Sequence, residues 1–248
     1  MRLIMDARDG EAGPVAGTGR NREGTAGSGP GAIAPDGSAV EFYAAMAPDE
    51  ASAALVHAAV PAGTPVLELG AGAGRVTRAL LALGHPVTAV DDSAEMLARI
   101  EDARTEGVRT VRSAIQDLDL GERFGCVLLM SFLVNYGDRA ALLDACRRHA
   151  APGGLVLLQR ETRPWLGPDA PRAWSHDGVD FEVVRAEPAG PDAAAVTIGY
   201  STGGRRWTHS FTSRRLGDDE LPAVLAASGL RLDRFLDGDR AWVAARPA

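Results

Sequence analysis

The chain contains no lysine. All 26 of its basic residues are arginines, set against 33 acidic residues in 248, for a formal net charge of −7. This absence excludes a Schiff-base lysine, a pyridoxal-phosphate anchor and a phosphate-loop lysine. The arginines are scattered among acids, whereas phosphate contacts need clustered positive charge. The composition therefore argues against a nucleic-acid binder.

Cysteine and long apolar runs are also scarce. Cys126 and Cys146 are the only two cysteines, which is too few for a disulfide framework or a zinc site, so we expect no metal. No apolar run approaches the ~20 residues that span a membrane. The opening residues Met1–Asp6 are too short for the apolar core of a signal peptide. We therefore expect a cytoplasmic protein with no membrane partner.

Residues 1–37 differ in composition from the rest of the chain. Nine of the 29 glycines fall here, together with three prolines, and apolar periodicity is missing. Such a stretch buries too little apolar surface to offset the entropy cost of ordering it. We predict a disordered tail over residues 1–37 and one domain over residues 38–248.

From Ser38 onward the pattern is that of an α/β protein. Five strands alternate with helices, which implies parallel pairing, and a helix and a closing hairpin end the chain. We predict a mostly parallel seven-stranded sheet with helices on both faces. Residues 160–215 instead alternate with period two, which predicts an antiparallel β insert after strand five. The predicted strands are Val66–Leu69, Val87–Val90, Val108–Arg112, Cys126–Ser131, Leu155–Gln159, Val179–Val184, Ala195–Ser201, Arg206–Ser213, Leu230–Phe235 and Ala241–Ala245.

The most informative segment is Val66–Arg75, which reads VLELGAGAGR and joins the first strand to a helix. Glycines at such a turn let the backbone approach a ligand, and the helix N-terminus offers free N–H groups. The dinucleotide fingerprint would need glycine where this chain has Arg75. Glu68, two residues before the first glycine, would repel a pyrophosphate but suits an ammonium group.

A second acid lies at the end of the next strand. Asp91 follows Gly70 by about twenty residues, and an acid at this strand tip can accept both hydroxyl groups of a ribose. The expected ligand is thus a nucleoside with an amino-acid end. S-adenosylmethionine has both features.

Three segments, VLELGAGAGRVT, VTAVDDSAEML and APGGLVLLQ, resemble those of the class I S-adenosylmethionine-dependent methyltransferases in order and spacing. The resemblance covers about residues 38–248. It implies a Rossmann-like fold, S-adenosylmethionine as cofactor, and methyl transfer as the activity.

The resemblance also implies residue roles. The loop under the methionine part of the cofactor would comprise Glu68, Gly70, Ala71, Gly72 and Gly74. Arg75 would pair with the ligand carboxylate, Tyr43 would touch the same end, and Asp91 would bind the ribose. Asp92 either joins Asp91 or caps the following helix, for which Ser93 is the other candidate cap. Met96 either packs by the adenine or belongs to the helix core.

The adenine side departs from the family pattern. The family often has an acid after strand three, where this chain has Ala114. Ile115 would cover the adenine face, with Met130, at the end of strand four, among the further cofactor contacts. Gln116, Asp117 or a backbone carbonyl would then take the adenine amino group.

Transfer of the methyl group should occur beyond the carboxyl ends of the strands. The polar groups expected there are Asn135 and Tyr136 after strand four, and Arg160 and Glu161 after strand five. His209 shares a strand face with Trp207 and Phe211, and either it or His176 is the candidate general base. A mechanism without an essential base is the other alternative.

We therefore expect methylation of a small molecule, such as a specialised metabolite, at nitrogen or oxygen. One alternative is an enzyme, such as a cyclase, that binds S-adenosylmethionine without transferring its methyl group. A nicotinamide-dependent oxidoreductase is another, although Arg75 and Glu68 count against it. The sequence leaves open a monomer or a homodimer.

Overall fold

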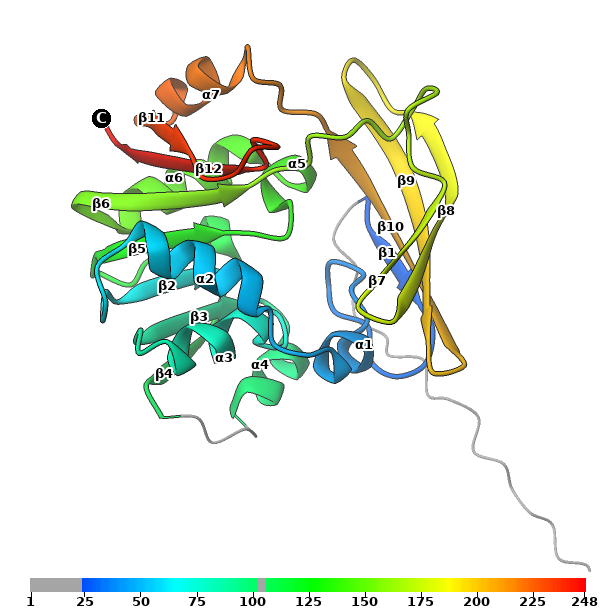
Figure 1. Ribbon diagram of the computed structural model, residues 1–248, viewed down its shortest axis with the longest axis horizontal. Helices are drawn as coiled ribbons and strands as arrows, with labels where there is room; N and C mark the ends of the chain where they lie inside the picture. The colour runs from blue at the N-terminus through cyan, green and yellow to red at the C-terminus, as the bar shows by residue number, and fades with distance from the viewer. Residues whose placement is uncertain (1–23, 102–105) are drawn as a thin grey trace, which may run out of the picture.

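The computed structural model describes residues 24–101 and 106–248, which contain two sheets; the smaller sheet stands beyond the carboxyl ends of the parallel strands of the larger one (Figure 1). The larger sheet has seven strands in the order β11-β12-β6-β5-β2-β3-β4. The first five along the chain are parallel, and the closing hairpin adds two antiparallel strands beside β6. This sheet confirms the predicted class. Its strands are β2 (Val66–Leu69), β3 (Val87–Asp91), β4 (Val108–Arg112), β5 (Phe124–Leu129), β6 (Ala150–Gln159), β11 (Leu230–Phe235) and β12 (Trp242–Pro247).

Helices cover both faces of this sheet (Figure 1). The central strand β5 sends Val127 and Leu129 into one buried cluster and Cys126 and Leu128 into the other, because side chains alternate along a strand. The helices that pack into the second cluster are α2 (Glu50–Ala59), α3 (Arg75–Ala82) and α4 (Ala94–Glu101); those on the opposite face are α6 (Arg139–His149) and α7 (Leu221–Ala227), with the 3₁₀ turn η1 (Ile115–Asp117).

The smaller sheet is antiparallel, in the order β1-β10-β9-β8-β7. Three of its strands confirm the predicted insert. β7 follows the strand-five tip, and β1 comes from the N-terminal region; the sequence predicted neither. The strands are β1 (Ala26–Ser28), β7 (Ala173–His176), β8 (Val179–Pro188), β9 (Ala193–Thr202) and β10 (Arg205–Arg214).

The prediction of a disordered tail is wrong for residues 24–37, while residues 1–23 lie outside the described part of the chain. β1 pairs with β10, with Gly27 opposite His209. The indole Nε1 of Trp207 donates to the carbonyl of Pro30 at 2.9 Å. A Cβ on Gly27 would lie 1.9 Å from the carbonyl oxygen of Gly37. The glycines here permit close backbone packing, and the partner strand lies about 180 residues away, where composition alone could not reveal it.

Two short helices lead from the N-terminal segment and from β5 toward the space between the sheets. α1 spans Val40–Ala45 and α5 spans Leu133–Tyr136. Within the described residues, no helix is long and apolar enough to cross a membrane.

Candidate active site

The glycine loop between β2 and α3 has three residues in the left-handed region. Gly70, Gly72 and Gly74 have φ values of 76°, 55° and 80°, which glycine adopts without steric cost. A Cβ at Gly70 would lie 2.5 Å from Leu133 Cδ1, and one at Gly74 would lie 2.6 Å from Ile100 Cγ1. A Cβ at Gly72 would meet no described atom within 4 Å. Gly72 therefore borders open space, while its two flanking glycines allow close packing.

Asp91 is joined to this loop. As the last residue of β3, it accepts a hydrogen bond from the Gly72 N–H at 2.8 Å (Oδ2) and another from the Ser93 N–H at 2.9 Å (Oδ1). Burial raises the pKa of Asp91 to about 6, although these two hydrogen bonds oppose the rise. Each carboxylate oxygen has a second lone pair, which suits a ligand with two adjacent hydroxyl groups.

Glu68 lies beneath the loop and is 4% exposed. The Thr77 hydroxyl donates to its Oε2 at 2.5 Å. Burial raises the pKa of Glu68 to about 7; the Thr77 hydrogen bond and Arg78 counteract this, and Asp91 adds to it. A cationic ligand group near Glu68 would favour its ionised form. The sequence did not single out Thr77, although it lies within the first helical turn after the glycines.

Arg75 and Tyr43 come together at the entrance to the loop. Arg75 Nε donates to the Ala47 carbonyl at 2.9 Å, and its Nη atoms have no hydrogen-bond partner in the described part of the chain. Burial raises the pKa of Tyr43 to about 12; Asp36 raises it further and Arg75 lowers it. The guanidinium end of Arg75 is thus available to a carboxylate. Asp36, which falls within the predicted tail, is a site residue that the sequence did not reveal.

The predicted adenine contacts differ in their surroundings. Ile115 and Met130 are buried beside the strand tips, and the side chain of Ala71 belongs to the core. Met96 packs with buried apolar side chains of the N-terminal segment and the glycine loop, which favours the helix-core alternative. Gln116 is exposed.

The cap of α4 is Ser93 and not Asp92. The Met96 N–H donates to the Ser93 hydroxyl oxygen at 3.2 Å. The alternative in which Asp92 caps this helix is therefore wrong, and Ser93 also donates its own N–H to Asp91. One serine thus links the ribose-side acid to the start of the helix.

Asn135 connects three segments and is 2% exposed. Its Nδ2 donates to the Arg214 carbonyl at 3.0 Å, and its Oδ1 accepts from the Glu161 N–H at 2.9 Å. Both ends of the amide are therefore used to hold α5, β10 and the end of β6 together. This arrangement fits a positioning role better than direct contact with a reacting atom.

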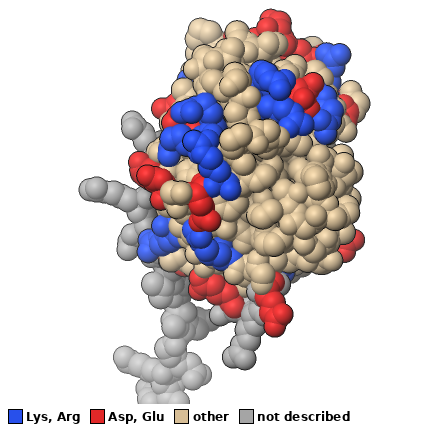
Figure 2. Space-filling model, turned by 90° about the vertical axis from the view of Figure 1, so that its left-hand side faces the viewer, with Lys and Arg blue, Asp and Glu red and all other residues tan. Residues whose placement is uncertain are grey.

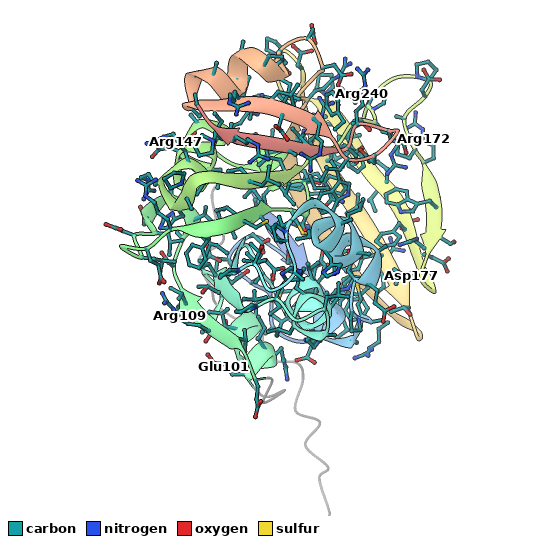
Figure 3. All side chains as sticks on the ribbon, turned by 60° about the vertical axis from the view of Figure 1, so that its left-hand side comes forward. Glu101, Arg109, Arg147, Arg172, Asp177 and Arg240 are labelled. Carbon is teal, nitrogen blue, oxygen red and sulfur yellow. The ribbon has the colours of Figure 1, made fainter. Side chains whose placement is uncertain are left out.

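The prediction that Arg160 lines the transfer pocket is wrong. Its side chain is 1% exposed, and its three nitrogens donate to the Arg240 and Leu216 carbonyls and to the Asp218 carboxylate. It also lies over the Phe235 ring, 5.6 Å from the centroid. Arg240, labelled in Figure 3, belongs to the loop before β12. Arg160 thus ties β6 to the C-terminal hairpin.

Tyr136 and the two candidate histidines have distinct surroundings. Tyr136 packs on Phe211, with ring centroids 4.6 Å apart; burial raises its pKa, and Glu161 and Tyr43 add to the rise. His209 Nε2 lies 2.9 Å from the Asp36 carbonyl, which engages that nitrogen. His176 is 72% exposed beside Asp177, the latter labelled in Figure 3. Of these three, Tyr136 and His209 lie between the sheets.

Backbone strain marks the tip of β5. Ser131 and Phe132 have φ values of 53° and 60°, although neither is glycine. The Ser131 N–H donates to Gln159 Oε1 at 2.9 Å, which helps to hold this conformation. Strained residues often cluster at functional sites, but nothing in the sequence indicated a left-handed turn here.

Comparisons with known proteins agree with this geometry. Residues 67–158 match the family described as "Methyltransferase domain". A ubiquinone biosynthesis O-methyltransferase from Bradyrhizobium sp. (strain ORS 278) is 31% identical over 106 residues, 42% of this chain and 42% of that protein. The chain thus matches less than half of this relative's length.

Two solved structures are similar over most of the chain. One is S-adenosylmethionine-bound CalS10, an amino pentose methyltransferase from Micromonospora echinaspora (TM-score 0.62, 23% identity, 86% of this chain and 93% of that one). The other is the sugar N-methyltransferase KedS8 from Streptoalloteichus sp. (TM-score 0.60, 16% identity, 99% and 98%). At sequence identities this low, the structural similarity shows a shared fold.

Proposed function

We propose that the chain methylates a small molecule at nitrogen or oxygen, with S-adenosylmethionine as cofactor, because residues 67–158 match the family described as "Methyltransferase domain" and the chain has the class I methyltransferase fold. The observation that carries this proposal is the hydrogen bond from the Gly72 N–H to the Asp91 carboxylate. A loop with open space beside Gly72 is hydrogen-bonded to a strand-tip carboxylate. Such a pair suits a ribose lying across the loop.

The other residues of the site fit the rest of this cofactor. Glu68 would bind its ammonium group and Arg75 its carboxylate. Ile115 and Met130 would contact the adenine, whose amino group is left for a backbone carbonyl or the exposed Gln116 side chain. When bound, the cofactor supplies an electrophilic methyl group on a positively charged sulfur.

The residues of this chain would mainly position the cofactor and the acceptor and exclude water from the site. Proximity and orientation can supply roughly 7–11 kcal/mol of a transfer barrier. Tyr43 and Tyr136 lie between the glycine loop and the smaller sheet, and Asn135 fixes α5 relative to β10. His209 is held by the Asp36 carbonyl. Because a carbonyl only accepts, this contact places the proton on Nε2 and leaves the lone pair on Nδ1. A His209 base and a mechanism without an essential base are thus both compatible with this contact.

We also propose the finer assignments. Residues 160–215 would form the substrate side of a domain that spans residues 38–248. The segment from residue 24 to residue 37 would add to this side, because β1 pairs with β10. The protein would act in the cytoplasm, in specialised metabolism, without nucleic acid. On the face in Figure 2, arginines are interspersed with acids and uncharged residues, which supports a small molecule as substrate. A monomer and a homodimer both remain compatible with this proposal.

The test is the formation of S-adenosylhomocysteine. The protein would be incubated with S-adenosylmethionine and separate panels of amines, phenols and alcohols. We expect acceptor-dependent S-adenosylhomocysteine together with a product that is about 14 mass units heavier than the acceptor, the mass of the CH₂ added by methyl transfer. Product without S-adenosylhomocysteine would favour a non-methylating enzyme such as a cyclase and would contradict methyl transfer.

A further inference from the structure

A cavity of about 230 Å³ lies between the two sheets, away from the glycine loop. It is open to solvent on one side and is lined by Asn135 of α5, by the chain that follows β6, by the turn between β8 and β9 and by the end of β10. Its apolar wall includes Pro164, Trp165, Leu166 and Ala194. Because an apolar cavity of about 150 Å³ accommodates benzene, this one has room for a single ring with a short substituent.

The helix α5 connects this cavity to the proposed cofactor site. At its start, Leu133 Cδ1 lies against Gly70, at 2.5 Å from where a Cβ would be. Two residues later, Asn135 lines the cavity. Since a helix rises about 1.5 Å per residue and has 3.6 residues per turn, Leu133 and Asn135 lie about 3 Å apart along the helix axis, within about half a turn. A ligand in the cavity would thus be a neighbour of a cofactor on the loop.

The buried charge in the cavity wall is Glu161, which is 7% exposed. Its Oε1 accepts from the Arg163 N–H at 2.9 Å and lies 3.5 Å from Arg163 Nε, but that guanidinium is 62% exposed. In the described part of the chain, Oε2 has no hydrogen-bond donor. Oε2 is thus the carboxylate oxygen left to accept a hydrogen bond from a ligand in the cavity.

The backbone holds this carboxylate in place. The Glu161 N–H donates to Asn135 Oδ1 at 2.9 Å, and Asn135 Nδ2 donates to the Arg214 carbonyl at 3.0 Å. Trp165 also lines the cavity, and its ring centroid lies 5.8 Å from that of Phe211 in a T-shaped pair. A fixed carboxylate and an aromatic side chain in one cavity are a favourable setting for a cationic nitrogen.

We propose that this cavity is the acceptor site and that it takes a ring-sized amine, whose ammonium group is bound by Glu161. Before transfer one proton would pass from the nitrogen to the Glu161 carboxylate, so that the nitrogen lone pair forms the new N–C bond as the S–C bond of the cofactor breaks. The inference rests on the proposed methyl-transfer function and narrows its substrate class. An acidic acceptor is disfavoured because Arg163 and Arg215, the arginines lining the cavity, are exposed to solvent, whereas Glu161 is buried.

The experiment measures binding of three probes of equal ring size, benzylamine, benzyl alcohol and benzoate, to the full chain saturated with S-adenosylhomocysteine. We expect benzylamine to bind at about neutral pH and the other two to bind at least about tenfold more weakly, because charge-assisted hydrogen bonds are about twice as strong as neutral ones. Glu161→Gln should weaken benzylamine binding by about tenfold or more, through loss of the charge.

The matched control is Glu187→Gln, the same exchange at an exposed β8 residue that is paired with Arg185 outside the cavity. It should leave benzylamine binding unchanged. Equal benzylamine affinity in Glu161→Gln and the unmodified chain would overturn the proposal, as would no benzylamine binding to any variant. Benzoate binding that is lost in Arg215→Gln would also overturn it. Failure of S-adenosylhomocysteine itself to bind would instead contradict the proposed function.

Discussion

The Asp91 carboxylate accepts a 2.8 Å hydrogen bond from the backbone N–H of Gly72, although 19 residues separate them. The tip of β3 and the middle of the glycine loop therefore form one unit. The open space beside Gly72 and the remaining lone pairs of Asp91 face the same proposed ligand. This relationship decides which substitutions should damage binding and which should damage folding.

Asp91→Asn should weaken binding of S-adenosylmethionine at least about tenfold, because charged hydrogen bonds contribute roughly 1.5–3 kcal/mol each. The pKa of Asp91 in the free protein is raised to about 6. Affinity in the unmodified chain should therefore increase as the pH rises from about 5 to 7, and this increase should be smaller in Asp91→Asn. Titration calorimetry at several pH values measures both effects, and identical pH profiles would contradict the assignment.

Gly72→Ala and Gly74→Ala should separate binding from folding. Both impose a left-handed alanine, at a cost of roughly 1–2 kcal/mol. Only at Gly74 does the new Cβ also approach a core side chain, 2.6 Å from Ile100 Cγ1. We expect Gly74→Ala to be less stable to urea by a further ~1–3 kcal/mol, while Gly72→Ala folds but binds the cofactor at least about tenfold more weakly. Equal stability of the two variants would argue against this packing.

Glu68→Gln should stabilise the free protein at high pH. Burial raises the folded-state pKa of Glu68 from 4.5 to about 7. The buried carboxyl is therefore protonated and tolerated below about pH 4.5. As the pH rises through about 7 it must ionise in the folded protein, and the free energy of unfolding falls. The introduced amide would mimic the protonated form at every pH, so the variant should be more stable by roughly 2–3 kcal/mol at about pH 8 and nearly equal at about pH 4.5. Urea unfolding at both pH values measures this, and a pH-independent difference would contradict it.

Gly27→Ala should destabilise the fold, because the N-terminal segment is packed against β10. The added Cβ would lie 1.9 Å from the Gly37 carbonyl oxygen. Gly238→Ala is the matched control, since its Cβ would meet no described atom within 4 Å. We expect Gly27→Ala to lower the melting temperature by several degrees. Each kcal/mol of lost unfolding free energy lowers the melting temperature by roughly 4–8 °C in a small domain and by less in a larger one. A melting temperature unchanged in both variants would show that this segment contributes no stability.

The sequence predicted the elements whose signals are local. The alternation of strands and helices predicted the seven-stranded sheet. The glycine spacing and Asp91 likewise predicted the loop and its acid partner. Each of these features depends on residues close together in the chain or at a fixed offset from a strand end.

The features that the sequence did not reveal depend on distant contacts. β1 lies in a glycine-rich segment and becomes a strand only because β10 provides its hydrogen-bond partners. Arg160 follows a strand tip, as a catalytic group would, but the C-terminal loops supply acceptors for all its nitrogens. His209 shares the predicted face with Trp207, and that face packs on residues 30–36. The alternation of side chains along one strand predicts a shared face. It does not show whether that face lines a pocket or packs against a distant segment.

We propose that the Gly72–Asp91 unit is the part of the chain on which binding of S-adenosylmethionine depends most. The most direct measurement is calorimetric titration of the full chain, and of Asp91→Asn, with S-adenosylmethionine, S-adenosylhomocysteine and NAD⁺. We expect saturable binding of the first two, weakened at least about tenfold by the substitution, and no binding of NAD⁺. Binding of NAD⁺ without either S-adenosyl compound, or S-adenosylmethionine affinity unaffected by Asp91→Asn, would contradict it.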